Sequence, residues 1–160
     1  MPGKFSADLE IGHKLEYFLA WVLEKKYSEV LVSQGRFKFF DIHIPATGRK
    51  IECKFDKKSK VTQNIAVEYE CFGKPSGISS TEAHDWVILL WDDTQEKWVF
   101  AIVEVEHLKK LCEGKRSVSG GDYYASRMYL VPKRELLASP FVKIKTFEKY
   151  LIEYKQLSVN

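Results

Sequence analysis

The 160-residue chain has a formal net charge of +3, and 45% of its residues are hydrophobic, which suits one globular domain over residues 1–160. No apolar run reaches the roughly 18 residues that a membrane helix needs, and the first residues lack the basic-then-apolar pattern of an export signal. The three cysteines are widely spaced and odd in number, which favours free thiols over a disulfide framework or a zinc cluster. We therefore expect a cytoplasmic protein that is not secreted.

The first half of the chain predicts a helix followed by strands. In order, these are a helix over 8–26, a short apolar strand at 29–33, strands over 36–44 and 49–56, and a further strand over 65–72. The link 45–48 reads Pro-Ala-Thr-Gly, and proline and glycine between two β-rich runs indicate a hairpin.

The second half alternates strands with short helices. The expected elements are strands at 86–91 and 98–103, a helix at 105–112, a strand at 128–131, a helical turn at 133–138 and a last strand at 142–147. One helix, then a central group of strands, then further helices indicate an α+β or α/β fold.

The predicted hairpin brings two carboxylates together. Side chains alternate along a strand, so Glu52 and Lys54 share one face while the apolar neighbours share the other. If the turn pairs Ile44 with Arg49, Asp41 lies opposite Glu52, at about 4.5–5.5 Å between directly paired Cβ atoms. Two carboxylates that close repel each other unless a cation lies between them.

Magnesium suits this position, because it prefers hard oxygen ligands and bridges carboxylates to substrate phosphates. The predicted metal ligands are Asp41, Glu52 and the backbone carbonyl of Cys53, with Mg²⁺ or Mn²⁺ as the ion. Lys54 would lie beside the metal, where it steers the attacking water or stabilises charge in the transition state.

An aspartate followed across a hairpin by Glu-x-Lys resembles the PD-(D/E)xK nuclease superfamily, which holds restriction-type endonucleases, phage exonucleases and Holliday junction resolvases. The resemblance implies a restriction-endonuclease-like fold, with a mixed central β-sheet flanked by helices. It also implies that Asp41, Glu52 and Lys54 are the catalytic residues. Phe40 stands where many members carry proline, and members vary at this position.

Three further segments extend the resemblance over roughly residues 8–135. Glu10 on the N-terminal helix resembles a glutamate that joins the metal site in resolvase-like members; the alternative is an exposed helix residue near Lys14. Segments 68–79 and 120–132 are similar to small phage-encoded nucleases.

Polar residues beyond the motif are candidates for contacts with DNA phosphates. They are Lys57, Lys58, Lys60, Gln63, Ser76 and Ser79. The alternatives are solvated lysines on an ordinary surface and, for the serines, a structural turn.

The sequence therefore predicts a Mg²⁺-dependent DNA endonuclease of a phage or prokaryotic setting, acting on branched or structured DNA in a resolvase-like manner. The alternative is a non-catalytic DNA-binding module that keeps the nuclease fold. A homodimer is also predicted, because two groups of apolar residues offer a self-interface unless they complete the monomer's core. These residues are Phe37, Phe39 and Phe40, and Phe141, Phe147, Tyr150, Leu151, Ile152 and Tyr154.

Overall fold

The structure, a computed structural model, describes residues 15–35 and 39–159. Its α-helices are α2 (Leu15–Leu23), α3 (Val105–Cys112), α4 (Lys133–Ala138) and α5 (Glu148–Val159). Its strands are β1 (Leu31–Val32), β2 (Ile42–Ile44), β3 (Arg49–Phe55), β4 (Asn64–Cys71), β5 (Lys74–Pro75), β6 (Asp85–Asp92), β7 (Lys97–Glu104), β8 (Ser117–Gly120), β9 (Ser126–Pro132) and β10 (Lys143–Lys145). Three short 3₁₀ helices are η1 (Lys57–Lys60), η2 (Gly77–Ser79) and η3 (Asp122–Tyr124).

The strands form two sheets. A six-stranded sheet has the order β1-β2-β3-β6-β7-β10, and a four-stranded antiparallel sheet has the order β5-β4-β9-β8. In the larger sheet β3 and β6 run parallel, and the other neighbouring strands run antiparallel. The expected mixed α/β architecture with a mixed central sheet is confirmed.

The six-stranded sheet is buried on both faces, because its central strands alternate between two apolar clusters. In β6, Trp86, Ile88 and Leu90 belong to one cluster, and Val87, Leu89 and Trp91 to the other. A strand that is buried on both faces reads as a continuous apolar run, which is why this segment is recognisable in the sequence.

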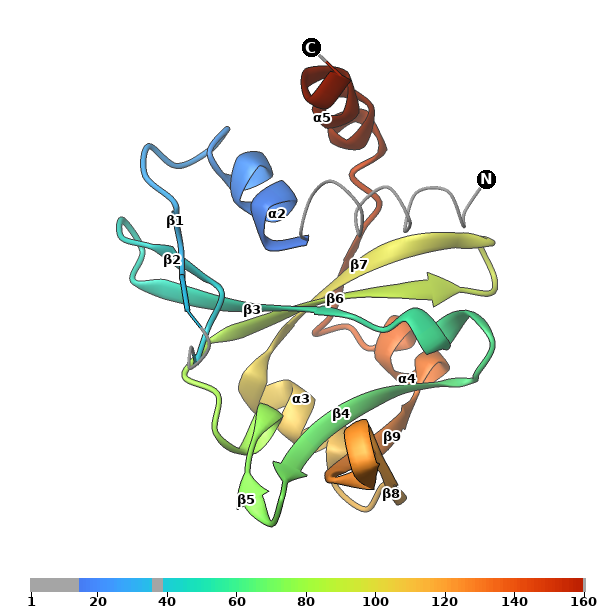
Figure 1. The fold of residues 1–160 in the computed structure, drawn as a ribbon. Helices are drawn as coiled ribbons and strands as arrows, with labels where there is room; N and C mark the ends of the chain where they lie inside the picture. The colour runs from blue at the N-terminus through green and yellow to red at the C-terminus, as the bar shows by residue number, and fades with distance from the viewer. Residues whose placement is uncertain (1–14, 36–38, 160) are drawn as a thin grey trace.

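Helices cover one face of this sheet and the second sheet covers the other. α2 and α5 lie above the six-stranded sheet in Figure 1, and the four-stranded sheet lies below it with α3 and α4. None of the helices in the described residues is long and apolar enough to cross a membrane.

The sequence predictions hold best for local elements. The helices at 105–112 and 133–138 and the hairpin of β2 and β3 are confirmed, and all three cysteines are free. The last strand is shorter than expected, and the helix α5 that follows it was not predicted. Nor was β8, the edge strand of the second sheet. Residues 8–14 of the first predicted helix and 36–38 of the predicted strand lie outside the described residues.

The apolar residues assigned to a self-interface divide between the core and the surface. Phe147, Tyr150, Leu151 and Tyr154 pack against the cluster under α2, as the alternative reading expected, and Phe40 packs against the other cluster. Phe39, Phe141 and Ile152 are exposed, and Phe37 lies outside the described residues. The homodimer stays a prediction, resting on fewer residues.

Candidate active site

The hairpin that carries the motif has the predicted register. Its pairs are Ile44 opposite Arg49, His43 opposite Lys50 and Ile42 opposite Ile51. Gly48 closes the turn with a φ of 71°, a left-handed conformation that glycine adopts without strain, and donates its N–H to the carbonyl of Ile44 at 2.9 Å. The turn therefore fixes where Asp41 meets β3.

One edge of β3 is bonded to β6. The carbonyl of Lys50 accepts from the N–H of His84 at 2.8 Å, and the N–H of Asp56 donates to the carbonyl of Leu89 at 2.9 Å. Backbone groups point to alternate sides along a strand, and the N–H and C=O of one residue point to the same side. The even-numbered residues of β3 thus direct their backbone groups toward β6, and the odd-numbered ones toward β2.

Asp41 occupies the other edge of β3. Strand pairing with β2 ends at Ile42, and Asp41 lies one residue before it, with its N–H donating to the carbonyl of Ile51 at 2.8 Å. The residue is 5% exposed, and its Oδ2 accepts the N–H of Cys53 at 2.7 Å. Because the carbonyl of Cys53 points to the same side as its N–H, that oxygen and the Asp41 carboxylate share one edge of β3.

Glu52 and Lys54 form an ion pair on one face of β3. The Nζ of Lys54 lies 3.0 Å from Oε1 of Glu52 and 5.3 Å from the ring centre of Trp86 on β6. Trp86 belongs to the cluster between the two sheets, which places Lys54 on that side. The apolar residues Cys53 and Phe55 contact the opposite cluster, as strand alternation predicted.

Lys54 lines a cavity between the two sheets. The cavity has a volume of about 340 Å³. It is bordered by Lys54, Asp56, Lys57 and Lys58 from the end of β3 and η1, by Met128 on β9 and by Gly121 after β8. Trp86 forms part of its wall. A basic, partly apolar cavity therefore opens beside the predicted catalytic lysine.

The candidate metal ligands are oxygen atoms on or beside β3. Asp41, Glu52 and the Cys53 carbonyl offer two carboxylates and a backbone oxygen, the kinds of ligand that Mg²⁺ prefers. Within residues 15–35 and 39–159, no group of three or more His, Cys, Asp or Glu side chains has a geometry suited to a metal. Glu10, the predicted additional ligand, lies outside the described residues.

The three predicted DNA-binding lysines do not share one direction. Lys57, Lys58 and Lys60 are all exposed on η1. Lys57 and Lys58 border the cavity with Lys54, whereas the Nζ of Lys60 lies 4.8 Å from the ring centre of Trp91, which belongs to the cluster on the opposite face of the sheet. The structure thus groups two of the three lysines with the motif.

A buried polar network holds η1 in place. Asp56 accepts the N–H of Ser59 at 3.1 Å and that of Ala66 at 2.8 Å. Burial raises the pKa of its carboxyl above the usual value, and these two hydrogen bonds offset part of that rise. Lys133, 3% exposed, donates from Nζ to the carbonyl of Ser59 at 2.7 Å and to Oδ2 of Asp93 at 2.6 Å. This network fixes the turn that presents Lys57 and Lys58.

The remaining predicted contacts lie elsewhere. Gln63 is exposed before β4, and its carbonyl accepts the N–H of Lys133 at 2.9 Å. Ser79 borders a separate cavity beside α3, and Ser76 precedes η2 with a buried Oγ that has no hydrogen-bond partner among the described residues. None of the three lines the Lys54 cavity.

Sequence reasoning missed Trp86, Asp56 and Lys133 as parts of this region. The parallel register sets Glu52 opposite Trp86, a pairing between segments far apart in the chain that no local pattern reveals. A signal was available for Asp56, because an aspartate three residues before a serine at the end of a strand is typical of a capped turn.

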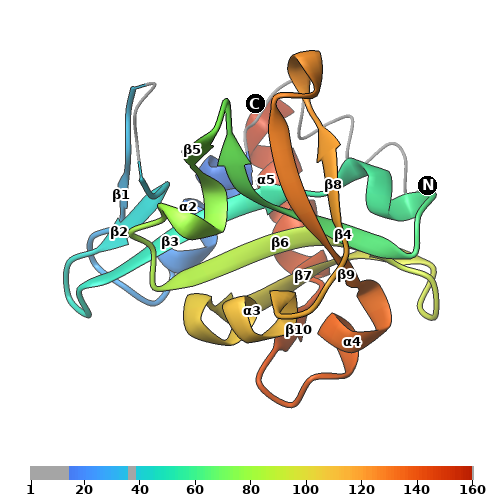
Figure 2. The same cartoon turned by 90° about the horizontal axis from the view of Figure 1, so that it is seen from below.

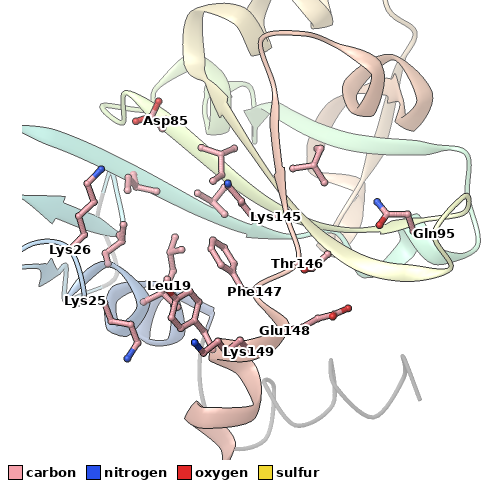
Figure 3. A pocket seen from close by; sticks show the side chains of 17 residues that line it. Leu19, Lys25, Lys26, Asp85, Gln95, Lys145, Thr146, Phe147, Glu148 and Lys149 are labelled. Atoms are coloured by element: carbon pink, nitrogen blue, oxygen red, sulfur yellow. The ribbon is translucent and has the colours of Figure 1, made fainter.

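A larger cavity lies on the other side of the six-stranded sheet. It measures about 890 Å³ between α2 and the segment that joins β10 to α5, with Leu19 and Phe147 among its lining residues (Figure 3). Its carboxylates Asp85 and Glu148 are engaged with Arg49 and Lys97 at 2.7 and 2.9 Å. Size alone therefore does not identify the candidate site. Of the motif residues, Lys54 lines the smaller cavity, and Asp41 and Glu52 line neither of the two.

No protein-family model matches the sequence, and a comparison with curated proteins gives no significant match. The resemblance to the PD-(D/E)xK superfamily therefore rests on the residues and geometry above.

Proposed function

We propose that this protein is a metal-dependent nuclease that hydrolyses DNA phosphodiester bonds, with a restriction-endonuclease-like arrangement of its central sheet. The observation that carries the proposal is the junction of β2 and β3. There the Asp41 carboxylate and the Cys53 carbonyl share one strand edge, and the adjacent residues Glu52 and Lys54 form an ion pair on one face. This combination of groups is what the resemblance requires.

Each residue has a separate role in the proposed reaction. Asp41, Glu52 and the Cys53 carbonyl would hold the cation, which supplies Lewis acidity toward a phosphate oxygen or a water molecule when bound. Lys54 donates hydrogen bonds to the attacking water or to the phosphate oxygens as negative charge accumulates. The Trp86 ring gives Lys54 a second contact besides Glu52.

The resolvase-like activity on branched DNA, in a phage or prokaryotic cell, is the finer part of the proposal. Symmetric cutting of a junction needs two active centres related by a two-fold axis. This part of the proposal therefore requires that the protein forms a homodimer. Exposed Phe39, Phe141 and Ile152 are the residues that remain for a self-interface.

One rival function is favoured by a specific observation. Lys54 already neutralises Glu52 at 3.0 Å, and Asp41 is buried against the β3 backbone, so both carboxylates have structural partners. A DNA-binding module that keeps the fold without catalysis would use them in this way. This rival function predicts that the protein binds DNA but does not cleave it in the presence of any divalent metal ion.

A panel of substrates separates the two functions. Plasmid, linear duplex, single-stranded and four-way-junction DNA are incubated with the protein in Mg²⁺, in Mn²⁺ and in excess EDTA. We expect cleavage with either metal and none in EDTA, because hydrolysis depends on the bound cation. Cutting that continues undiminished in EDTA would contradict the proposal, and binding without cutting in every condition would favour the rival.

A further inference from the structure

Three exposed aromatic residues lie at one end of the second sheet. Phe72 is in the turn between β4 and β5, and Tyr123 and Tyr124 are in the connection between β8 and β9. Their exposed fractions are 73%, 93% and 79%. The two connections are bonded to each other, since the N–H of Phe72 donates to the carbonyl of Ala125 at 2.9 Å, and both lie at the same end of the sheet in Figure 2. We call Phe72, Tyr123 and Tyr124 the aromatic tip.

The aromatic tip is costly for the fold and contributes little packing. Five non-glycine residues of the described chain have a positive φ, and three of them are Phe72, Tyr123 and Tyr124, at 50°, 57° and 53°. Bulky side chains are strained in this left-handed conformation, and turns of this kind favour glycine or asparagine. Because all three rings are exposed, packing of the rings does not offset the backbone strain. Strain that is kept without such compensation points to a functional role.

The tip adjoins the proposed active site. Gly121, where the β8–β9 connection begins, borders the same cavity as Lys54, Lys57 and Lys58. The cleft between the sheets therefore has lysines on one rim and the base of the aromatic connection on the other.

The charges near the tip favour an anionic ligand. Lys74 and Arg127 are exposed on the strands that adjoin it, and the Nε of Arg127 donates to the hydroxyl of Tyr69 at 3.0 Å. The negative groups are Asp122 within the connection and Glu70, which pairs with Arg127 across β4 and β9. The cavity itself is lined by Lys54, Lys57 and Lys58 and by one carboxylate, Asp56, so positive charge exceeds negative along its wall.

We propose that the aromatic tip stacks on unpaired bases of nucleic acid that enters the cleft, so that the protein prefers DNA with single-stranded ends, flaps or branches. Aromatic side chains beside basic groups are the usual means of binding single strands, because every base offers a flat face to stack on. The inference rests on the proposed function for the identity of the ligand, and it adds the surface that recognises the unpaired bases of such DNA.

The test measures affinity without cleavage. Fluorescence anisotropy in EDTA gives the Kd of wild-type protein for a single-stranded oligonucleotide, a flapped duplex and a blunt duplex. The double variant Tyr123→Ala/Tyr124→Ala should lose affinity for the first two by about 5-fold to about 150-fold per stacked base, equivalent to about 1–3 kcal/mol. Its affinity for blunt duplex should stay unchanged.

Two control variants separate stacking from folding. Tyr123→Phe/Tyr124→Phe keeps both rings and should retain wild-type affinity for single strands. Leu157→Ala removes an apolar side chain that is 58% exposed on α5, away from the second sheet, and should change nothing. A 2-aminopurine placed at successive unpaired positions should change its fluorescence on binding wild-type protein at one or two positions, and not on binding the alanine variant.

The outcomes distinguish this inference from the nuclease proposal. In one outcome, the protein cleaves no DNA, but the alanine variant loses affinity for single strands. This result would support the stacking surface and reject the nuclease proposal. Metal-dependent cleavage combined with equal affinities in all variants would overturn the stacking surface alone. Binding of anionic lipid vesicles that depends on the two tyrosines, with oligonucleotide affinity unaffected, would assign the tip to a membrane and overturn the inference.

Discussion

At the scale of single residues, the candidate site depends on backbone atoms as much as on side chains. Asp41 uses its carboxylate to accept the N–H of Cys53, at the point where β2 no longer pairs with β3. This hydrogen bond holds the carboxylate on the same edge of β3 as the Cys53 carbonyl. Lys133 acts in a similar way on η1, because its buried ammonium satisfies the carbonyl of Ser59 and pairs with Asp93.

Replacing Lys133 with methionine should destabilise the protein. The substitution leaves the buried carbonyl of Ser59 without its donor, which costs about 1–3 kcal/mol in the free energy of unfolding. Urea denaturation of the purified variant measures this change. Lys115→Met is the matched control, because the Lys115–Glu135 pair at 2.9 Å is more exposed and should contribute at most about 1 kcal/mol. Equal losses in both variants would show that burial of Lys133 has no special importance.

At the scale of elements, η1 determines which lysines face the cleft. Its one turn directs Lys57 and Lys58 toward the cavity of Lys54, while Lys60 lies over the Trp91 ring. The sequence shows a run of lysines but not this division, because the direction of each side chain depends on how the turn docks on β4 and β6.

Neutralising Lys57 and Lys58 should weaken DNA binding alike for every sequence, because phosphate contacts carry no base information. In the variant Lys57→Gln/Lys58→Gln, the slope of log affinity against log salt on duplex DNA should flatten by up to about 0.9 per lost contact. Titrations across a range of salt concentrations measure it. Lys60→Gln should leave the slope almost as in wild type; a larger effect from Lys60 than from the other two would place the DNA on the opposite face.

The elements also show where prediction from the sequence ends. The β2–β3 hairpin was predictable to its register, because Pro45 and Gly48 define a local turn and apolar residues alternate along both strands. The parallel pairing of Glu52 with Trp86 was not, since it joins strands that are separated in the chain by four elements, η1, β4, β5 and η2. The second sheet depends in the same way on pairing Asn64–Cys71 with Ser126–Pro132. Such non-local pairings leave no periodic signal in either segment.

At the scale of the whole molecule, two sheets packed face to face create the cleft in which the proposed chemistry takes place. The helices α2 and α5 cover the far face of the six-stranded sheet, and the β8–β9 connection forms one end of the second sheet (Figures 1 and 2). Lys54, Lys57 and Lys58 line this cleft, and the connection that carries Tyr123 and Tyr124 begins at Gly121 on its border. The nuclease proposal depends on β3, which carries Glu52, Cys53 and Lys54, and on Asp41, which directly precedes β2.

The central claim is that Glu52 serves catalysis through a bound metal. It is tested most directly by the single-turnover rate of DNA cleavage in Mg²⁺, compared between wild type, Glu52→Gln and the control Glu106→Gln, an exposed glutamate on α3. Glutamine keeps the shape of Glu52 and removes its charge, and circular dichroism melting confirms that each variant is folded. We predict that Glu52→Gln lowers the cleavage rate by at least about 100-fold, whereas Glu106→Gln cleaves at the wild-type rate. Loss of a residue that only supports a metal ligand typically costs about 10-fold to about 100-fold, so a larger loss indicates a ligand itself. Cleavage by Glu52→Gln at the wild-type rate would contradict the account.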